Sequence, residues 1–309
     1  MTDDAGEDPP FHRVALIGLG LIGSSIARSI REALPGVELR AYDSSADVRS
    51  RAERLDLVDV LAEEPADAVA GADLVIFCVP VGAMAEAARS IASHLAASAV
   101  VSDVGSSKGP VANALKQALP GALIIPAHPI AGTENSGPEA GFAGLFSNRW
   151  CILTPEQDAD PDAVARLSAL WGKLGARVEV MEAARHDLVL AVTSHLPHLI
   201  AFTIVGTASH LEAVTEGEVI KYSAGGFRDF TRIAASDPVM WRDIFLSNRE
   251  AVLDVLGRFL GDLSQLEQAI RGGDGEELFD WFSRTRAIRR AIVYEGQDVA
   301  APDFGRTGS

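Results

Sequence analysis

The chain has 309 residues, of which 48% are hydrophobic and 23% are charged, as in ordinary globular proteins. This length is enough for two medium-sized domains, each with its own core. The formal net charge of −16 repels phosphate backbones, which argues against nucleic-acid binding and means that an anionic ligand needs a local cluster of cations. Two cysteines, Cys78 and Cys151, are too few for a disulfide scaffold or a Cys-based zinc site and fit a reducing cytoplasm.

The two ends of the chain have the composition of flexible tails. Residues 1–10 are acidic and polar, so they lack the basic start and apolar stretch of a secretory signal, and residues 297–309 are rich in Pro, Gly and Asp. Between them, no apolar run is expected to span a membrane. We therefore expect a cytoplasmic protein with no membrane partner.

From about residue 13 to residue 181, short apolar runs alternate with longer amphipathic stretches, the pattern of βα units in a parallel sheet. Short strands flanked by helices predict a sheet that is covered on both faces, and hence a doubly wound α/β domain over residues 11–182. The predicted strands are Val14–Gly18, Glu38–Tyr42, Leu74–Val79, Ala99–Asp103, Ala122–Pro126, Cys151–Thr154 and Arg177–Met181. Helices are predicted between them, for example at Ile22–Leu34, Met84–Leu95 and Asp162–Leu174.

Beyond residue 182 the strand signals stop. Helices are predicted over Ala183–His210, Pro238–Phe259 and Glu276–Tyr294, which gives an all-helical second domain over residues 183–296. Long apolar helices that follow a complete α/β domain need a partner surface. We therefore expect a two-fold homodimer that forms through the helical domain.

A Gly-x-Gly-x-x-Gly motif, residues 18–23, directly follows the first predicted strand and opens a helix. Gly18 permits a tight turn, Gly20 lets backbone approach a pyrophosphate, and Gly23 lets the helix pack against the strand. The start of the helix, at Leu21 and Ile22, then binds the anion. This arrangement predicts a Rossmann dinucleotide-binding domain, although a glycine turn without ligand gives the same pattern.

Asp43 ends the second predicted strand, about twenty residues after the glycine motif. A carboxylate at this place can accept hydrogen bonds from the ribose hydroxyls of the adenosine half. It would repel the extra phosphate of NADP, and no Arg or Lys follows it before Arg49. The predicted cofactor is therefore NAD.

His128 lies just past the predicted strand Ala122–Pro126, at the edge where open α/β sheets bind ligands. An imidazole there can accept a hydroxyl proton while the nicotinamide takes a hydride from the same carbon. A single histidine at such a place is more often structural, so its neighbours decide the interpretation.

Taken together, five segments resemble the prephenate dehydrogenase family, which includes arogenate and cyclohexadienyl dehydrogenases. They are the glycine motif, Asp103–Lys108, His128–Gly132, Ser194–His198 and Gly225–Ala234 with its continuation to Arg242. The resemblance covers residues 13–294. It implies a Rossmann domain with a helical dimerisation domain, and NAD-dependent oxidative decarboxylation of prephenate or arogenate, which are small dianionic substrates, to 4-hydroxyphenylpyruvate or tyrosine.

The resemblance also implies roles for five side chains. His128 matches the catalytic histidine, and Ser106 matches a serine that helps to orient this histidine and the substrate's ring hydroxyl. Arg232 matches an arginine that binds a substrate carboxylate, His198 matches a second histidine that contacts substrate, and His195 looks like a supporting group. Further cations for the substrate are expected from Arg228, Lys221 or Arg242.

Each of these roles has a simpler alternative. Ser106 is also suited to cap a helix, and Arg232 to form an ordinary ion pair. His195 and His198, three residues apart, share a helix face and could hold a metal, but hydride transfer to NAD needs none, and we expect no metal. Pro197 between them is expected to kink the helix.

Two other functions remain open. One is a dehydrogenase of the β-hydroxyacid or ketopantoate reductase type, families that use a lysine in the helical half, where this chain has only Lys221. The other is a non-catalytic NAD-binding sensor. The joint presence of His128, Ser106 and Arg232 argues against a sensor, which needs no proton acceptor beside the nicotinamide.

Overall fold

The computed structural model describes residues 8–133, 135–212 and 225–294. Lys221 and most of both expected tails lie outside these ranges. The chain divides into two compact units, residues 1–252 and 253–309.

A six-stranded parallel sheet forms the centre of the first unit. Its strands are β1 (Arg13–Ile17), β2 (Glu38–Tyr42), β3 (Val60–Leu61), β4 (Leu74–Phe77), β5 (Val100–Asp103) and β6 (Leu123–Ile124). The strand order is β3-β2-β1-β4-β5-β6, and every neighbouring pair is parallel. The order reverses between β1 and β4, and open sheets bind ligands in the crevice at such a point.

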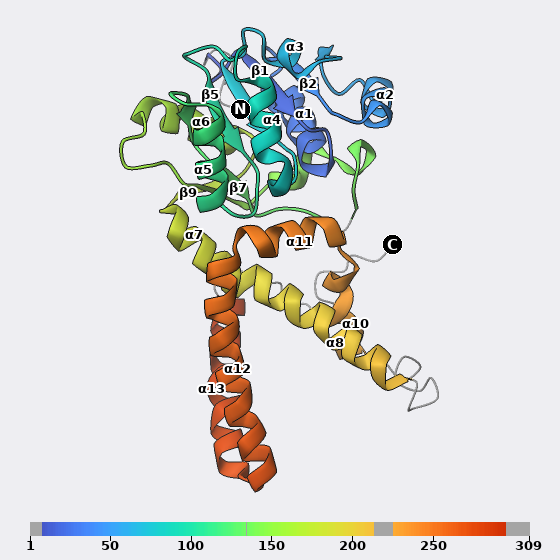
Figure 1. The fold of residues 1–309 in the computed structure, drawn as a ribbon, viewed down its shortest axis with the longest axis vertical. Coiled ribbons are helices and arrows are strands. Elements are labelled where there is room, and N and C mark those ends of the chain that lie inside the picture. Colours follow the sequence, from blue (N-terminus) through green and yellow to red (C-terminus); the bar gives the residue numbers. More distant parts are fainter. Residues whose placement is uncertain (1–7, 134, 213–224, 295–309) are drawn as a thin grey trace. The chain divides into compact units, whose positions relative to one another are not determined.

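Helices cover this sheet on both faces (Figure 1). They are α1 (Leu21–Ala33), α2 (Ala46–Arg54), α3 (Pro65–Val69), α4 (Met84–Ile91), α5 (Gly109–Ala118) and α6 (Pro161–Lys173). Alternate residues of β1 point to opposite faces: Leu16 packs in a cluster with Ile26 of α1, whereas Ile17 packs in a second cluster with Met84 of α4. Burial on both faces explains why the strands are apolar throughout, and it confirms the predicted doubly wound fold.

A second, three-stranded sheet follows. It consists of β7 (Ala127–Pro129), β8 (Trp150–Leu153) and β9 (Arg177–Val180), with β7 antiparallel to β8 and β8 parallel to β9. The two strands predicted near residues 151 and 177 therefore exist, but they lie outside the main sheet. As expected, His128 lies just past the main-sheet strand β6, which ends at Ile124. His128 lies within β7, opposite Ile152 of β8.

The rest of the first unit is helical. It comprises α7 (Ala183–Leu190), a π-helical turn (Ala191–His195), α8 (Leu196–Glu212), α10 (Gly225–Thr231), the 3-10 turn η5 (Arg232–Ala235), α11 (Pro238–Ser247) and the first residues of α12 (Arg249–Gly272). Pro197 is the second residue of α8, and the helical irregularity expected from this proline is the π-helical turn that ends at His195. The single helix predicted over Pro238–Phe259 is wrong, because the chain leaves helical geometry at Asn248 and continues as a second helix.

The run Ala183–His210 is long and apolar enough to cross a membrane by length and composition, contrary to our expectation from the sequence. The same test is passed by helices in the interior of globular proteins. This run carries the buried polar side chains of His186, Asp187 and His195, which are hydrogen-bonded within the protein. Such bonds are typical of a protein core.

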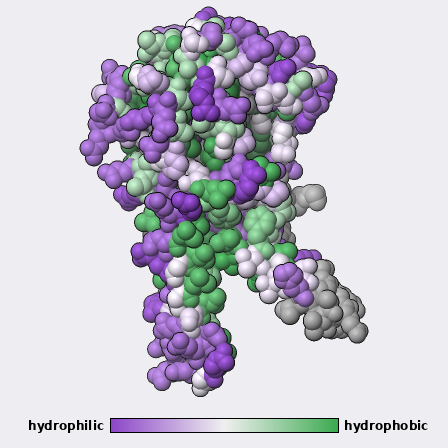
Figure 2. Space-filling view, viewed as in Figure 1, coloured by the Kyte–Doolittle hydropathy of each residue, from purple (hydrophilic) through white to green (hydrophobic). Residues whose placement is uncertain are grey.

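The second unit consists of the remainder of α12 and α13 (Gly275–Tyr294). Gly273, with a φ of +69°, makes the turn between them, and the Gln265 side chain donates a hydrogen bond to Glu277 at 2.6 Å. Large apolar side chains of both helices are exposed, and Figure 2 shows green atoms along these helices. They include Leu260, Leu263, Ile270, Phe279 and Phe282. An exposed apolar surface of this kind is typical of an interaction site.

Candidate active site

The glycine turn after β1 has room for a ligand at one of its three glycines. Gly18 has a φ of +105°, and a Cβ there would lie 2.7 Å from the Cys78 carbonyl oxygen. A Cβ on Gly23 would lie 2.1 Å from the Gly18 oxygen, so both positions require glycine for the turn and for helix packing. A Cβ on Gly20 would meet nothing within 4 Å, and Gly20 supplies no side-chain cap to α1. The open space and the uncapped N–H groups at Leu21 and Ile22 fit a pyrophosphate.

Asp43 lies beside this turn, directly after β2. Its carboxylate accepts hydrogen bonds from the backbone N–H groups of Leu19 at 2.8 Å and Ser45 at 2.9 Å. Each carboxylate oxygen keeps acceptor capacity for a ribose hydroxyl. The side chain of Arg49 returns to this place, donating to the Asp43 carbonyl at 2.7 Å and pairing with Glu63 at 3.5 Å. Although Arg49 comes six residues after Asp43 in the sequence, its guanidinium group contacts the backbone of Asp43.

His128 is the first member of a row of three hydrogen-bonded side chains. Its Nδ1 lies 2.9 Å from Nε2 of His186, and Nδ1 of His186 lies 2.9 Å from Oδ1 of Asp187. The Asp187 carboxylate also accepts the backbone N–H groups of Lys108 at 2.7 Å and Gly109 at 2.9 Å, at the start of α5. Neither His186 nor Asp187 was among the site residues that we expected from the sequence.

Within the described part of the chain, Ser106 has no direct contact of the kind that would orient His128 in the absence of substrate. Among the described residues no hydrogen bond joins Ser106 to His128, whose Nδ1 faces His186 instead. The next residue, Ser107, is fully buried and its hydroxyl lies 2.8 Å from the hydroxyl of Ser247 in α11. The motif of residues 103–108 is thus joined to the helical segment.

A buried ion pair holds the strand that carries His128. Lys108 and Asp103 are both fully buried and paired, and Lys108 Nζ also donates to the Ala127 carbonyl at 2.6 Å. Burial raises the pKa of Asp103 and lowers the pKa of Lys108, while their mutual attraction opposes both shifts. Because Asp103 ends β5 and Ala127 begins β7, the pair fixes β7 at the carboxyl edge of the main sheet.

The electrostatics of the row favour two neutral imidazoles and one carboxylate. Burial lowers the pKa of His128 well below its usual value, and positive charge on His186, Lys108 or His195 would lower it further. Burial also lowers the pKa of His186, against the opposing effect of Asp187. Burial alone would raise the pKa of Asp187, but hydrogen bonds from His186 and the backbone outweigh it and lower this pKa. A neutral His128 can accept a proton at neutral pH.

Asn248, at the break between α11 and α12, determines the tautomer of His195. Its Nδ2 donates to the Asp187 carbonyl at 2.8 Å and lies 3.1 Å from Nδ1 of His195. A carbonyl only accepts, so the amide nitrogen faces both groups and His195 Nδ1 is the acceptor. His195 Nε2 therefore carries the hydrogen, and this buried atom has no hydrogen-bond partner among the described residues. Burial lowers the pKa of His195 to about 4, which leaves a neutral donor.

His198 packs against Trp241 of α11, with stacked rings whose centroids are 3.7 Å apart. Its Nδ1 donates to the Ser194 carbonyl at 2.9 Å, so Nε2 keeps its lone pair. Burial lowers the pKa of His198, and the nearby charge of Arg232 in η5 adds to this effect. The structure thus brings His198, His195, Trp241 and Arg232 into one region of the first unit. Trp241 lies in a segment that carries the family resemblance, but no role was predicted for it; its Nε1 is buried without a partner among the described residues.

Of the additional cations suggested by the sequence, Lys221 lies outside the described residues. Arg242 pairs with Asp243 at 2.7 Å, and Arg228 is an exposed residue of α10.

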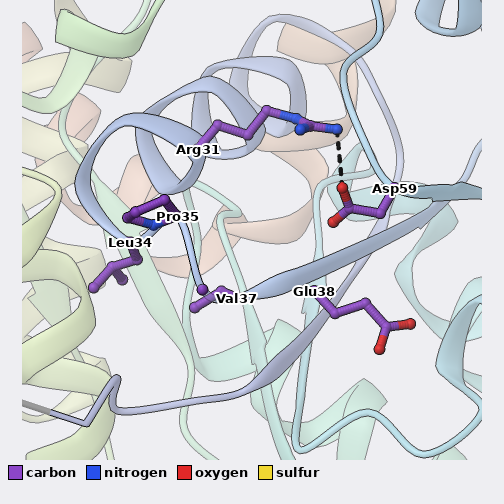
Figure 3. A pocket seen from close by; sticks show the side chains of 7 residues that line it. Arg31, Leu34, Pro35, Val37, Glu38 and Asp59 are labelled. Atoms are coloured by element: carbon purple, nitrogen blue, oxygen red, sulfur yellow. Dashed lines mark ion pairs between the residues drawn. The ribbon is translucent and has the colours of Figure 1, made fainter.

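A separate pocket of about 380 Å³ lies between the end of α1 and the start of β2, where Arg31 pairs with Asp59 at 3.2 Å (Figure 3). This is the amino end of β2, whereas the glycine turn is at the carboxyl edge of the sheet. The pocket therefore does not belong to the candidate site.

A parallel sheet of this order, an open glycine turn at its reversal point and a neutral histidine at the same edge define a dinucleotide-dependent oxidoreductase. Family models agree: the nucleotide-binding domain of prephenate dehydrogenase matches residues 26–180, and its dimerization domain matches residues 182–284. The chain belongs to the prephenate dehydrogenase family, as the sequence resemblance implied. A β-hydroxyacid or ketopantoate reductase type is not supported.

Individual relatives agree over nearly the whole chain. A cyclohexadienyl dehydrogenase of Zymomonas mobilis is 45% identical over 91% of this chain and 96% of its own length. A prephenate dehydrogenase of Bacillus subtilis is 35% identical over 94% of this chain and 78% of its own length. The crystal structure of prephenate dehydrogenase from A. aeolicus in complex with hydroxyphenyl propionate and NAD+ matches with a TM-score of 0.85 and 35% identity, covering 91% of this chain and 98% of that one.

Proposed function

We propose that the protein catalyses the NAD-dependent oxidative decarboxylation of prephenate, arogenate or both, giving 4-hydroxyphenylpyruvate or tyrosine. The observation that carries this proposal is the neutral His128, hydrogen-bonded to His186 at the edge of the sheet that also bears the open glycine turn. The 45% identity to a cyclohexadienyl dehydrogenase supports the choice of substrate class.

The residues of the glycine turn fit NAD. Bound NAD+ supplies the acceptor for the hydride that leaves the carbon bearing the ring hydroxyl. The open position at Gly20 and the free start of α1 suit the pyrophosphate, and the carboxylate of Asp43 suits the ribose. The proposed contacts are Gly18, Gly20, Leu21, Ile22, Gly23 and Asp43.

The proposed proton acceptor is Nε2 of His128, which makes no hydrogen bond among the described residues. It takes the proton of the ring hydroxyl as the hydride departs, so that a carbonyl forms at that carbon. The ring carboxylate then leaves as carbon dioxide, because its loss makes the ring aromatic. We assign to Ser106 a role in orienting the hydroxyl.

Substrate binding in a protein of net charge −16 requires local cations for two carboxylates. Arg232 is the proposed partner of one carboxylate, since a guanidinium binds such a group through two parallel hydrogen bonds. Its charge acts on His198, which together with His195 is the proposed contact to the rest of the substrate. No metal is required for this chemistry.

We also propose a homodimer in the cytoplasm, with a domain boundary near residue 182. The description of the second matching family as a dimerization domain and the exposed apolar side chains of α12 and α13 support self-association.

The test is a spectrophotometric assay of NADH formation on mixing the purified protein with NAD+ and either prephenate or arogenate. We expect a signal with at least one of them, and the ratio of initial rates gives the preference. The His128→Asn variant, prepared in parallel, controls for contaminating activity. The absence of NADH with both substrates would refute the proposal and favour a non-catalytic NAD-binding protein.

A further inference from the structure

We propose that His186 is a positioning residue that fixes the tautomer of His128, so that the proton-accepting nitrogen of His128 always faces the substrate. This inference rests on the proposed function, because it assigns how the proton acceptor of that reaction is prepared. The arrangement that carries it is the row His128, His186 and Asp187.

The direction of each hydrogen bond in the row follows from its last member. The Asp187 carboxylate accepts two backbone N–H groups, which only donate, and this keeps it ionised. A carboxylate accepts, so Nδ1 of His186 must carry the hydrogen that lies between them. The neutral His186 therefore has its lone pair on Nε2.

The tautomer of His186 in turn determines the tautomer of His128. Because Nε2 of His186 is an acceptor, the hydrogen between the two rings belongs to Nδ1 of His128. The neutral His128 then has its lone pair on Nε2, the atom that receives the substrate proton. An unconstrained imidazole in water prefers the opposite tautomer, with hydrogen on Nε2. The row thus works against the intrinsic preference of His128.

The charged and titratable groups around the row are consistent with this assignment. His128 faces Lys108 before α5, His186 in α7 and His195 in the π-helical turn. His186 faces Asp187, Lys108 and Asp103 of β5. Lys108 is paired with Asp103, so the unbalanced charge next to the two imidazoles is the carboxylate of Asp187.

The proton step balances within the row. The O–H bond of the substrate hydroxyl breaks and an N–H bond forms at Nε2 of His128, which becomes an imidazolium. Its Nδ1–H still donates to His186, and the charge of Asp187, transmitted through the polarised His186, stabilises the new cation. When the ring carboxylate leaves as carbon dioxide, the electron pair of the broken C–C bond makes the ring oxygen a phenolate, which takes the proton back from Nε2 of His128, so that His128, His186 and Asp187 end unchanged.

Two substitutions of His186 separate its two hydrogen bonds. The side-chain amide nitrogen of Asn takes the place of Nδ1, so His186→Asn keeps the bond to Asp187 and loses the bond to His128. The longer Gln side chain reaches the place of Nε2, so His186→Gln keeps an acceptor for His128. We expect His186→Asn to lower kcat by about 10²-fold with little change in KM, and His186→Gln to recover part of this loss. His94→Asn, an exchange at an exposed histidine, is the matched control.

The second readout does not depend on activity. Nitrogen chemical shifts of histidine side chains distinguish protonated from unprotonated ring nitrogens, and the His128 signals are assigned by their loss in His128→Asn. In the protein without ligands we expect hydrogen on Nδ1 of His128, and a change toward hydrogen on Nε2 in His186→Asn. Nucleotide binding and circular dichroism of each variant check that it is folded.

Two results would overturn the proposal: hydrogen on Nε2 of His128 in the unmodified protein, or a His186→Asn variant with unchanged kcat. In either case the protein could still oxidise prephenate or arogenate, so the proposed function would stand. Conversely, a protein inactive on both substrates refutes the proposed function, while the nitrogen shifts still decide the tautomer.

Discussion

Replacing Lys108 with Met tests the buried ion pair that holds β7. The substitution keeps a side chain of similar length but leaves the Asp103 carboxylate buried without its cation and the Ala127 carbonyl without its donor. Removing one partner of a buried pair costs about 3 to 5 kcal/mol, and losing the donor to a buried carbonyl adds about 1 kcal/mol. We therefore expect Lys108→Met to lower the free energy of unfolding by about 4 to 6 kcal/mol near neutral pH.

The loss should depend on pH in a definite direction. Burial already raises the pKa of Asp103, and without Lys108 this pKa rises further above that of the unfolded chain. A raised pKa in the folded state adds stability below it, and this contribution disappears as the pH rises through it. The deficit of Lys108→Met relative to the unmodified protein should therefore shrink between about pH 8 and about pH 5.

Urea unfolding followed by circular dichroism measures these differences, at one fixed protein concentration because subunit association adds to apparent stability. The double variant Asp103→Asn with Lys108→Met removes the unpaired charge, and we expect it to be more stable than Lys108→Met alone. A deficit below about 1 kcal/mol would refute the reasoning, and so would a double variant that is no more stable than the single one.

Four further predictions concern the site and the subunit interface. His128→Asn should lower kcat by about 10²- to 10⁴-fold with little change in KM, whereas Arg232→Ala should mainly raise KM; equal effects on KM would contradict these roles. Asp43→Ser should raise the relative use of NADP over NAD in initial-rate measurements, and an unchanged preference would mean that Asp43 does not contact the ribose. Burial keeps the pKa of His128 well below 6.5, and the unprotonated ring is the active form. Turnover should therefore stay level from about pH 8 to about pH 6.5 and fall only at lower pH. A half-maximal rate at a pH above about 6.5 would contradict this lowered pKa. Leu263→Asp places a charge on a side chain that is 49% exposed on α12, and light scattering should show dissociation of the proposed homodimer, whereas an unchanged mass would exclude this face from the interface.

The sequence was sufficient for the elements whose pattern is local. The five residues of β1 and the glycine motif after it are recognisable because the local backbone conformation and burial require these residue types. Gly18, for example, has a positive φ that favours glycine. The strands β3 and β7 have two and three residues, too few for any periodicity to appear. The membership of β8 in a separate sheet depends on pairing with β7, which is not encoded within β8 itself.

The site was predictable to a similar extent. His128 and the pair His195 and His198 stand in recognisable motifs, but the role of His186 depends on a contact between residues that are 58 positions apart. A sequence signal was nevertheless present, because His186 and Asp187 form a His-Asp dipeptide at the start of a helix. The π-helical turn that follows also shifts the helical phase, so a fixed period of 3.6 residues does not relate His186 to His195.

One amino acid, Asp187, connects parts of the chain that would otherwise be mechanically independent. Through its side chain it touches the start of α5 and His186, and through its carbonyl it receives Asn248 from the junction of α11 and α12. A shift of that junction by a fraction of an ångström would stretch the Asn248 contact and alter the donor state of His195. Substitutions that never meet the substrate, if they move this junction, can thus change how fast the protein works.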